Sequence, residues 1–274
     1  SSDTVNTNEV HATLSLTLSE AVVQQANIGN LKLSTSVTGN HRLRNLQVAE
    51  LKGRLNKLSR GDYSVEQLSF DGSFRTNTAP NLNTNNLVAP WIIDLELQAK
   101  NARDGTTQLR SVGVELSWHT PKLKLDSLTV EFPDGTLNAD VKSDMETRLV
   151  DLNLSGYFPL EQITHLIGER NAKHLSQYRF KSAPDIRLAG QLQLPKRNWK
   201  KLDWKRDLEP RLKAAGSITA GAGDYRGITF DSAKTDLNLT NQLLILPNLH
   251  VVRPEGELHL TYTNHLVTRD YSFG

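Results

Sequence analysis

Several residue types are scarce in this chain, and each scarcity excludes a class of protein. The absence of cysteine excludes a disulfide framework, a thiolate metal site and a cysteine nucleophile. Aromatic residues make up only 6% of the 274 residues, so large side chains that fill a thick core are few. No apolar run approaches the roughly 18 residues of a membrane-spanning helix, and no signal peptide opens the chain. The formal net charge of +2 does not indicate a strongly basic nucleic-acid-binding protein.

Most of the chain alternates apolar and polar residues, which is typical of β-strands with one dry face. Leu14, Leu16 and Leu18, for example, alternate with serine and threonine. Turn signals containing glycine separate such stretches at positions 29, 39–40, 61–62 and 104–105. The sequence therefore predicts an all-β protein, with a long exposed loop in the asparagine-, threonine- and proline-rich residues 76–90.

One stretch of the chain recurs. Residues 128–137 read LTVEFPDGTL, and residues 249–258, which lie 121 positions later, read LHVVRPEGEL. The alignment extends in both directions without a gap and includes a Thr-Arg pair that begins at Thr147 and again at Thr268. The shared Pro-acid-Gly turn and this pair predict repeated β-meander units at about 109–154 and 230–273.

A weaker repeat unit is predicted at about 28–58, because a shift of 82 positions places Leu46 and Gly53 on Leu128 and Gly135. This unit lacks the proline of the other two. Nothing in the composition requires a division, so we expect one elongated β domain over the whole chain. Because the chain begins with serine and stops directly after an alternating stretch, we expect it to be a fragment of a longer protein whose targeting or anchoring segment has been removed.

Residues 159–178 interrupt the β pattern. Leu160, Ile163 and Ile167 recur at helical spacing, and Pro159 suits a first helical turn. Gly168 costs about 1 kcal/mol relative to alanine, so the helix is expected to bend or break there. A lone amphipathic helix in a β protein is expected to cover a bare apolar face or a sheet end.

No catalytic motif is present: the sequence lacks His-Glu-x-x-His, Gly-x-Ser-x-Gly and a phosphate-binding loop. Asp134 and Glu255 stand in equivalent turns, and paired carboxylates can hydrolyse glycosides, but an acid between proline and glycine is ordinary in a turn. His250 and His259 are expected to lie near each other across a hairpin. Without a third ligand we predict no metal site, and no cofactor or enzymatic activity is expected.

Residues 195–213 hold eight lysines or arginines against three acids. Two interpretations stay open: tryptophan and cations that meet anionic lipid headgroups, or a solvated connection whose indole rings anchor it to the domain. Aromatic and cationic residues also bind single-stranded nucleic acid, but one short segment on a nearly neutral chain does not favour that partner. The residues of the possible membrane interface are Trp199, Lys200, Lys201, Trp204, Lys205 and Arg206.

The alternating strands leave two architectures open. A closed barrel or a two-sheet sandwich would bury the aliphatic residues as ordinary core. A curved sheet that closes incompletely would instead leave them along an apolar trough. Periodicity alone does not decide between the two.

Two stretches resemble the C-terminal region of AsmA-like envelope proteins. They are residues 125–156, LDSLTVEFPDGTLNADVKSDMETRLVDLNLSG, and residues 227–273, in which leucine-rich strands run through a short turn into similar strands. The resemblance is best over residues 112–154 and 184–274 and weak before residue 90. It implies a curved antiparallel repeating β-groove, folded like a taco, with an apolar concave face and the helix as its cover.

The resemblance also implies a location and a function. AsmA-like proteins are tethered to the inner membrane, extend into the periplasm and carry phospholipid between the inner and outer membranes without catalysis. Expected partners are phospholipid or another lipid, envelope membrane proteins, and further repeats of the same chain. The alternatives are a structural module in outer-membrane assembly and a carbohydrate-binding or carbohydrate-active β protein. The positions expected to line the groove are Val112, Val114, Leu116, Leu123, Leu125, Leu128, Val130, Leu237, Leu239, Leu244, Leu246 and Leu249.

Overall fold

The computed structural model divides the chain into two compact units, Ser1–Leu128 and Thr129–Gly274. Their boundary lies inside strand β7 (Lys122–Phe132), and therefore inside the repeat predicted at 109–154. The single elongated domain favoured by the sequence is thus described as two parts, each by itself. The structure describes residues 9–40, 46–76, 91–105, 107–160, 173, 176–196, 203–268 and 270–274.

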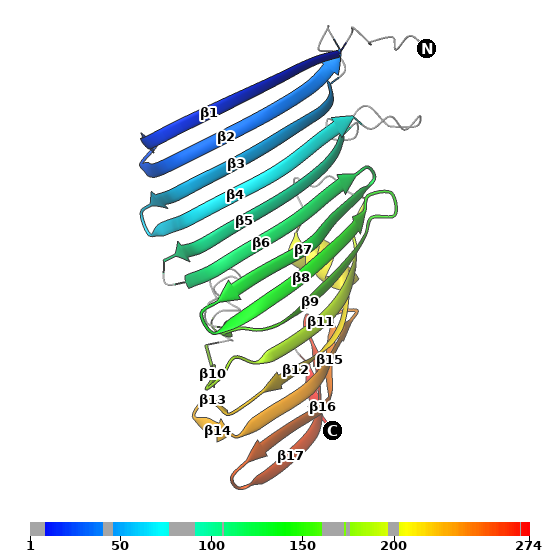
Figure 1. Ribbon diagram of the computed structural model, residues 1–274. Coiled ribbons are helices and arrows are strands. Elements are labelled where there is room, and N and C mark those ends of the chain that lie inside the picture. The colour runs from blue at the N-terminus through cyan, green and yellow to red at the C-terminus, as the bar shows by residue number, and fades with distance from the viewer. Residues whose placement is uncertain are drawn as a thin grey trace, which may run out of the picture. The chain divides into compact units, whose positions relative to one another are not determined.

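The first unit is an antiparallel sheet in which each strand lies beside its neighbours in the sequence (Figure 1). Its strands before β7 are 13 to 15 residues long, more than twice the usual strand length of about five to six residues. The long alternating stretches account for this length. The strands before β7 are β1 (Glu9–Val23), β2 (Ala26–Asn40), β3 (Leu46–Arg60), β4 (Tyr63–Thr76), β5 (Trp91–Asp104) and β6 (Thr107–His119).

Tight turns end several of these strands where the sequence predicts them. Gly61 and Gly105 both have φ of 57°, the left-handed conformation that glycine adopts without a steric cost. Gly29 was predicted as a turn, and that prediction is wrong, because Gly29 lies within β2. A Cβ atom on Gly29 would clash with the backbone oxygen of Asn56, so glycine is needed there for close approach of two strands.

The second unit contains two sheets. Its larger sheet is antiparallel and curved (Figure 1), and a smaller sheet holds three strands of three residues each: β10 (Tyr178–Phe180), β13 (Gly223–Tyr225) and β14 (Ile228–Phe230). A short π-helical turn, η3 (Trp204–Leu208), and a 3-10 turn, η4 (Glu209–Arg211), precede β12. In order, the larger sheet holds β8 (Gly135–Asp144), β9 (Leu149–Tyr157), β11 (Asp185–Gln193), β12 (Leu212–Ala220), β15 (Ser232–Thr240), β16 (Leu243–Arg253), β17 (Gly256–His265) and β18 (Tyr271–Phe273). The prediction of an all-β, curved antiparallel fold is confirmed.

The strands of the two main predicted repeats have matching boundaries. At the offset of 121 residues, β7 coincides with β16 and β8 coincides with β17, each at both ends. The weaker unit at 28–58 shows no such match, because Gly53 lies inside β3 whereas Gly135 begins β8.

The predicted helix over residues 159–178 falls largely outside the described residues. Within that range Lys173 is helical, but Ser176 and Gln177 form a turn and Tyr178 begins β10. The predicted C-terminal end is therefore wrong. Pairing with β13 overrides the local helical pattern, because Tyr178 lies opposite Tyr225 with the two ring centroids 4.6 Å apart.

Buried hydrophobic side chains are few in the described residues and unevenly distributed. Phe132 and Phe158 are 4% and 3% exposed, and their rings stack at a centroid distance of 6.1 Å. The first unit buries Leu55 and Ala99, whereas the second buries Phe132, Phe158, Ile186, Leu192, Leu194, Ala220 and Phe230.

Candidate functional site

One face of the sheet in the first unit is almost entirely apolar. In a β-strand successive side chains point to opposite faces, and directly paired residues of neighbouring strands point to the same face. Following the pairing from β1 to β6 gives four such rows. They are Leu18, Leu31, Leu55, Leu68, Ala99 and Val112; Leu16, Leu33, Gly53, Phe70, Leu97 and Val114; Leu14, Thr35, Leu51, Gly72, Leu95 and Leu116; and Ala12, Val37, Ala49, Phe74, Ile93 and Trp118.

The side chains of this face remain in contact with solvent. Leu55 and Ala99 are buried, and most of the other aliphatic and aromatic residues of the rows are half-buried. On β1 the exposure is larger, at 70% for Leu14, 49% for Leu16 and 38% for Leu18. Within the described part of the first unit, this face is therefore an apolar surface and not a filled core.

The ring of Phe70 fills the space left by the missing side chain of Gly53 on the apolar face. Gly53 has no side chain, and the ring of Phe70 from the paired strand occupies the space, together with Leu33. A Cβ atom at Gly53 would clash with that ring. An aromatic residue that covers a cross-strand glycine keeps the row continuous.

The second unit carries a similar apolar face. Leu237 and Leu239 on β15 belong to rows that cross several strands of the larger sheet. The rows are Ala139, Leu154, Leu188, Gly216 and Leu237; and Val141, Leu152, Gly190, Ala214, Leu239 and Leu244.

A β-bulge in β16 keeps its leucines on one face. The pairing of β16 with β17 shifts between Leu246 and Leu249, so the apolar positions change from even to odd numbers there. Pro247 lies in this irregularity, where a missing backbone donor is tolerated, and its carbonyl oxygen accepts a hydrogen bond from Thr261 Oγ1 at 2.7 Å. Leu244, Leu246 and Leu249 thus lie on the face that carries Leu239.

All twelve positions predicted to line a groove are half-buried; none is fully buried and none is fully exposed. Val112, Val114 and Leu116 end three of the rows in the first unit. On β7 the hydrogen bond from Ser117 Oγ to Asp126 Oδ2, at 2.7 Å, identifies the polar face, so the neighbouring Leu125 points to the apolar one.

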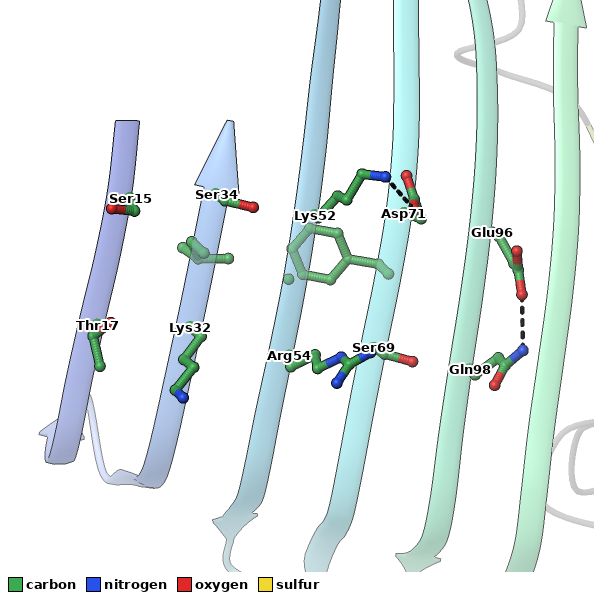
Figure 2. A pocket seen from close by; sticks show the side chains of 13 residues that line it. Ser15, Thr17, Lys32, Ser34, Lys52, Arg54, Ser69, Asp71, Glu96 and Gln98 are labelled. Atoms are coloured by element: carbon green, nitrogen blue, oxygen red, sulfur yellow. Dashed lines mark hydrogen bonds and ion pairs between the residues drawn. The ribbon is translucent and has the colours of Figure 1, made fainter. Parts of the chain in front are cut away.

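The opposite face of the first unit is polar (Figure 2). Lys52 Nζ and Asp71 Oδ2 lie 3.0 Å apart, and Gln98 donates a hydrogen bond to Glu96 at 2.8 Å. The pKa of Lys52 is raised, because its ammonium group donates to Asp71 and lies near the negative charges of Asp71 and Glu50. A shallow depression of about 520 Å³ follows two rows on this face: Ser15, Ser34, Lys52, Asp71 and Glu96; and Thr17, Lys32, Arg54, Ser69 and Gln98.

The sequence prediction of functional residues did not include this polar face. Its signal is the same alternation, read at the positions between the leucines. The sheet of the first unit is thus amphipathic, with hydrogen bonds and ion pairs on one side and aliphatic surface on the other.

The structure describes only part of residues 195–213, the basic segment that contains Trp199 and Trp204. Trp199, Lys200 and Lys201 lie outside the described residues, and Trp204 begins η3. Lys205 and Arg206 are exposed, but Arg206 Nη2 lies 2.9 Å from Asp207 Oδ2, which also raises the pKa of Arg206. The charge of Arg206 is therefore partly balanced within the segment.

The acids considered for glycoside chemistry are turn residues. Asp134 is exposed between β7 and β8, and Glu255 is exposed between β16 and β17. Glu255 Oε2 lies 3.2 Å from Arg253 Nη2, which gives this carboxylate a local structural partner.

Among the described residues, no helix is both long and apolar enough to span a membrane. Comparison with protein-family models, with curated proteins and with solved structures finds no match to this chain.

Proposed function

We propose that the apolar face binds the acyl chains of phospholipid or a similar lipid. The observation that carries the proposal is the set of rows of half-buried aliphatic side chains that cross six strands of the first unit. Of the predicted groove positions, Val112, Val114 and Leu116 belong to these rows, and Leu237, Leu239, Leu244, Leu246 and Leu249 belong to the counterpart in the second unit.

The chemistry of the face suits an acyl chain. Each methylene group removed from water contributes about 0.8 kcal/mol, and an aliphatic lining fixes neither the register nor the direction of the ligand. Strands spaced about 4.8 Å apart make a row of six about 24 Å long. The acyl region of one bilayer leaflet is about 15 Å thick, half of the roughly 30 Å hydrocarbon core, so a row offers one chain several overlapping positions. Overlapping positions permit sliding, which a carrier requires.

The resemblance to AsmA-like proteins supports a cellular location for this lipid binding. On that basis the chain is a non-enzymatic lipid-transfer segment in the periplasm, tethered to the inner membrane, that passes phospholipid between the inner and outer membranes. The headgroup stays in water, because the apolar rows present no charged side chain to it.

Two neighbouring residues of β5 give a matched test. Leu97 points to the apolar face and Gln98 to the polar one. Leu97→Lys should weaken binding of a delipidated sample to a fluorescent phospholipid about tenfold, equivalent to losing contact with about two methylene groups. Gln98→Lys adds the same charge to the other face and should leave binding unchanged.

A photo-crosslinking residue at each position in turn provides a test without a charged substitution. Lipid should be captured from position 97 and not from position 98. A purified chain that contains no lipid by native mass spectrometry, and that also ignores added phospholipid, would refute the proposal. Capture of proteins alone at position 97 would favour the structural module in outer-membrane assembly.

A further inference from the structure

Three potential metal ligands converge on the hairpin of β16 and β17. His250 Nε2 lies 3.1 Å from Glu257 Oε2, and His259 Nε2 lies 3.4 Å from the same oxygen. The two imidazole rings stack with centroids 4.0 Å apart and planes inclined by 10°. One ligand atom from each residue lies within 4.8 Å of the others.

Strand pairing explains why these residues meet. His250 and His259 are direct partners across the hairpin, and Glu257 precedes His259 by two positions, which places it on the same face. This face is opposite to that of Leu249 and Val251, so the cluster lies outside the apolar rows. The sequence-based argument against a metal site was that a third ligand is missing; in the structure Glu257 lies beside the histidine pair as a third candidate ligand.

The hairpin holds the cluster in place. Only Pro254 and Glu255 separate the two strands, and Arg253 pairs with Gly256 across the turn. The Arg253 side chain also lies 3.2 Å from Glu255 Oε2 and donates to the carbonyl oxygen of Thr229 at 3.0 Å. Hydrogen bonds from both imidazoles lower the pKa of Glu257.

We propose that His250, Glu257 and His259 form a binding site for a divalent late first-row transition-metal ion such as Zn²⁺. Around a tetrahedral ion with bonds of about 2.0–2.1 Å, neighbouring ligand atoms are about 3.3–3.4 Å apart. The two nitrogen–oxygen separations of 3.1 and 3.4 Å are close to that edge. Because the stacked imidazole rings are almost parallel, they must rotate for the lone pairs of both nitrogens to point at one ion. Water completes the coordination, since the side chains are 36%, 60% and 68% exposed in chain order.

The ligand set also selects the class of ion. Two imidazoles and one carboxylate suit Zn²⁺, Cu²⁺ or Ni²⁺, whereas Ca²⁺ and Mg²⁺ require mostly oxygen ligands.

Lys234 on β15 pairs with His250, and its positive charge opposes binding of the ion. Replacing Lys234 with glutamine should therefore tighten binding.

The equivalent hairpin of the other repeat, formed by β7 and β8, shows which residues can replace the two histidines. At the offset of 121 residues, His250, Glu257 and His259 correspond to Thr129, Thr136 and Asn138, none of which is a strong ligand for zinc. The double variant His250→Thr and His259→Asn gives the two histidine positions the residues of their counterparts and leaves Glu257 in place. Both threonine and asparagine already occupy the same strand positions there, so the fold should tolerate them.

Isothermal titration with ZnCl₂ tests the site. The unmodified chain should bind one Zn²⁺ per molecule, and the double variant should lose binding. Loss of an outer hydrogen-bond partner typically weakens metal binding about 10–100-fold, so loss of two ligands should exceed that. His119→Gln is the control, because His119 Nε2 lies 3.1 Å from Asp94 Oδ1 without a second imidazole in contact with that carboxylate among the described groups. This control should bind Zn²⁺ like the unmodified chain.

Electron paramagnetic resonance of the unmodified chain with Cu²⁺ gives an answer that does not depend on folding of a variant. The spectrum should show coupling to two imidazole nitrogens. The proposal is overturned by absence of Zn²⁺ binding to the unmodified chain, by binding that survives in a folded double variant, or by equal loss in His119→Gln.

Discussion

The two units use the same alternating sequence pattern to different ends. Among the described residues of the first unit, Leu55 and Ala99 are the only buried hydrophobic side chains, and the apolar face stays in contact with solvent. The second unit buries seven hydrophobic side chains and adds a three-stranded sheet with stacked aromatic rings. Alternation therefore determines which residues share a face, whereas full burial is concentrated in the second unit, at residues such as Phe132, Phe158 and Phe230.

The contrast suggests a division of energetic roles. Burial in the second unit stabilises it without a ligand. The first unit leaves part of its hydrophobic free energy unrealised until another apolar surface contacts it. Lipid binding is one way to realise that energy, and the following predictions test the contrast in order of expected effect.

Removing an aromatic ring from each unit should have unequal cost. Phe158→Ala deletes a ring that is 3% exposed and stacked on Phe132, and should lower the free energy of unfolding by about 3–5 kcal/mol. Phe74→Ala deletes a half-buried ring on the open face of the first unit and should cost less, about 1–2 kcal/mol. Urea unfolding followed by circular dichroism measures both. Equal losses would mean that the face around Phe74 is packed as tightly as that around Phe158.

Added lipid should stabilise the first unit more than the core of the second. A ligand at 100 times its dissociation constant stabilises the folded state by about 2.7 kcal/mol. Hydrogen exchange measured by mass spectrometry should show slower exchange in β3 to β6 when phospholipid is present, with little change around Phe158 and Ile186. Protection confined to the second unit would reverse the assignment of roles. The Leu97→Lys variant, whose affinity for lipid should be about tenfold lower, is the control and should show a smaller slowing at the same lipid concentration.

Gly53 in the first unit and Gly216 in the second differ in what an added Cβ atom would meet. A Cβ atom at Gly216 would clash with the backbone oxygen of Arg187, whereas one at Gly53 would clash with the ring of Phe70. Because backbone cannot swing aside and a side chain can, Gly216→Ala should cost about 1–3 kcal/mol and Gly53→Ala less. Gly113→Ala is the control, since no atom lies within 4 Å of its Cβ position, and it should be neutral or slightly stabilising in the same urea experiment. An equal cost for all three would show that packing at these positions does not govern stability.

The sequence predicted the parts of the molecule that depend on local pattern. Alternation identified the long strands, and the Pro-acid-Gly turns gave hairpins with matching boundaries. The three-residue strands β10, β13 and β14 were not predicted, because three residues are too few to show a period and their pairing joins residues far apart in the chain.

The candidate sites show the same division. Alternation identified the apolar positions, and the β-bulge at Pro247 explains why the numbering of those positions changes parity within β16. The proximity of Glu257 to His250 and His259 could not be predicted without knowing how β16 pairs with β17. A one-residue slip would have moved Glu257 to the other face.

The smallest predicted effect concerns Tyr178 in the three-stranded sheet. Partial burial beside Tyr225 raises its pKa above the ordinary value of about 10, with Tyr225 adding to the shift. The folded chain therefore keeps this proton at pH values where the unfolded chain has released it. The contribution to stability is complete below pH 10 and is lost as the pH rises through the folded-state pKa. Because Tyr178 is 39% exposed, solvent keeps the effect small. Absorbance at 295 nm, taken as the difference between the unmodified chain and Tyr178→Phe, should show a midpoint above pH 10 that returns to about 10 in urea. A midpoint at or below 10 in the folded protein would show that this sheet does not shield its tyrosine, and would weaken the distinction between a covered second unit and an open first one.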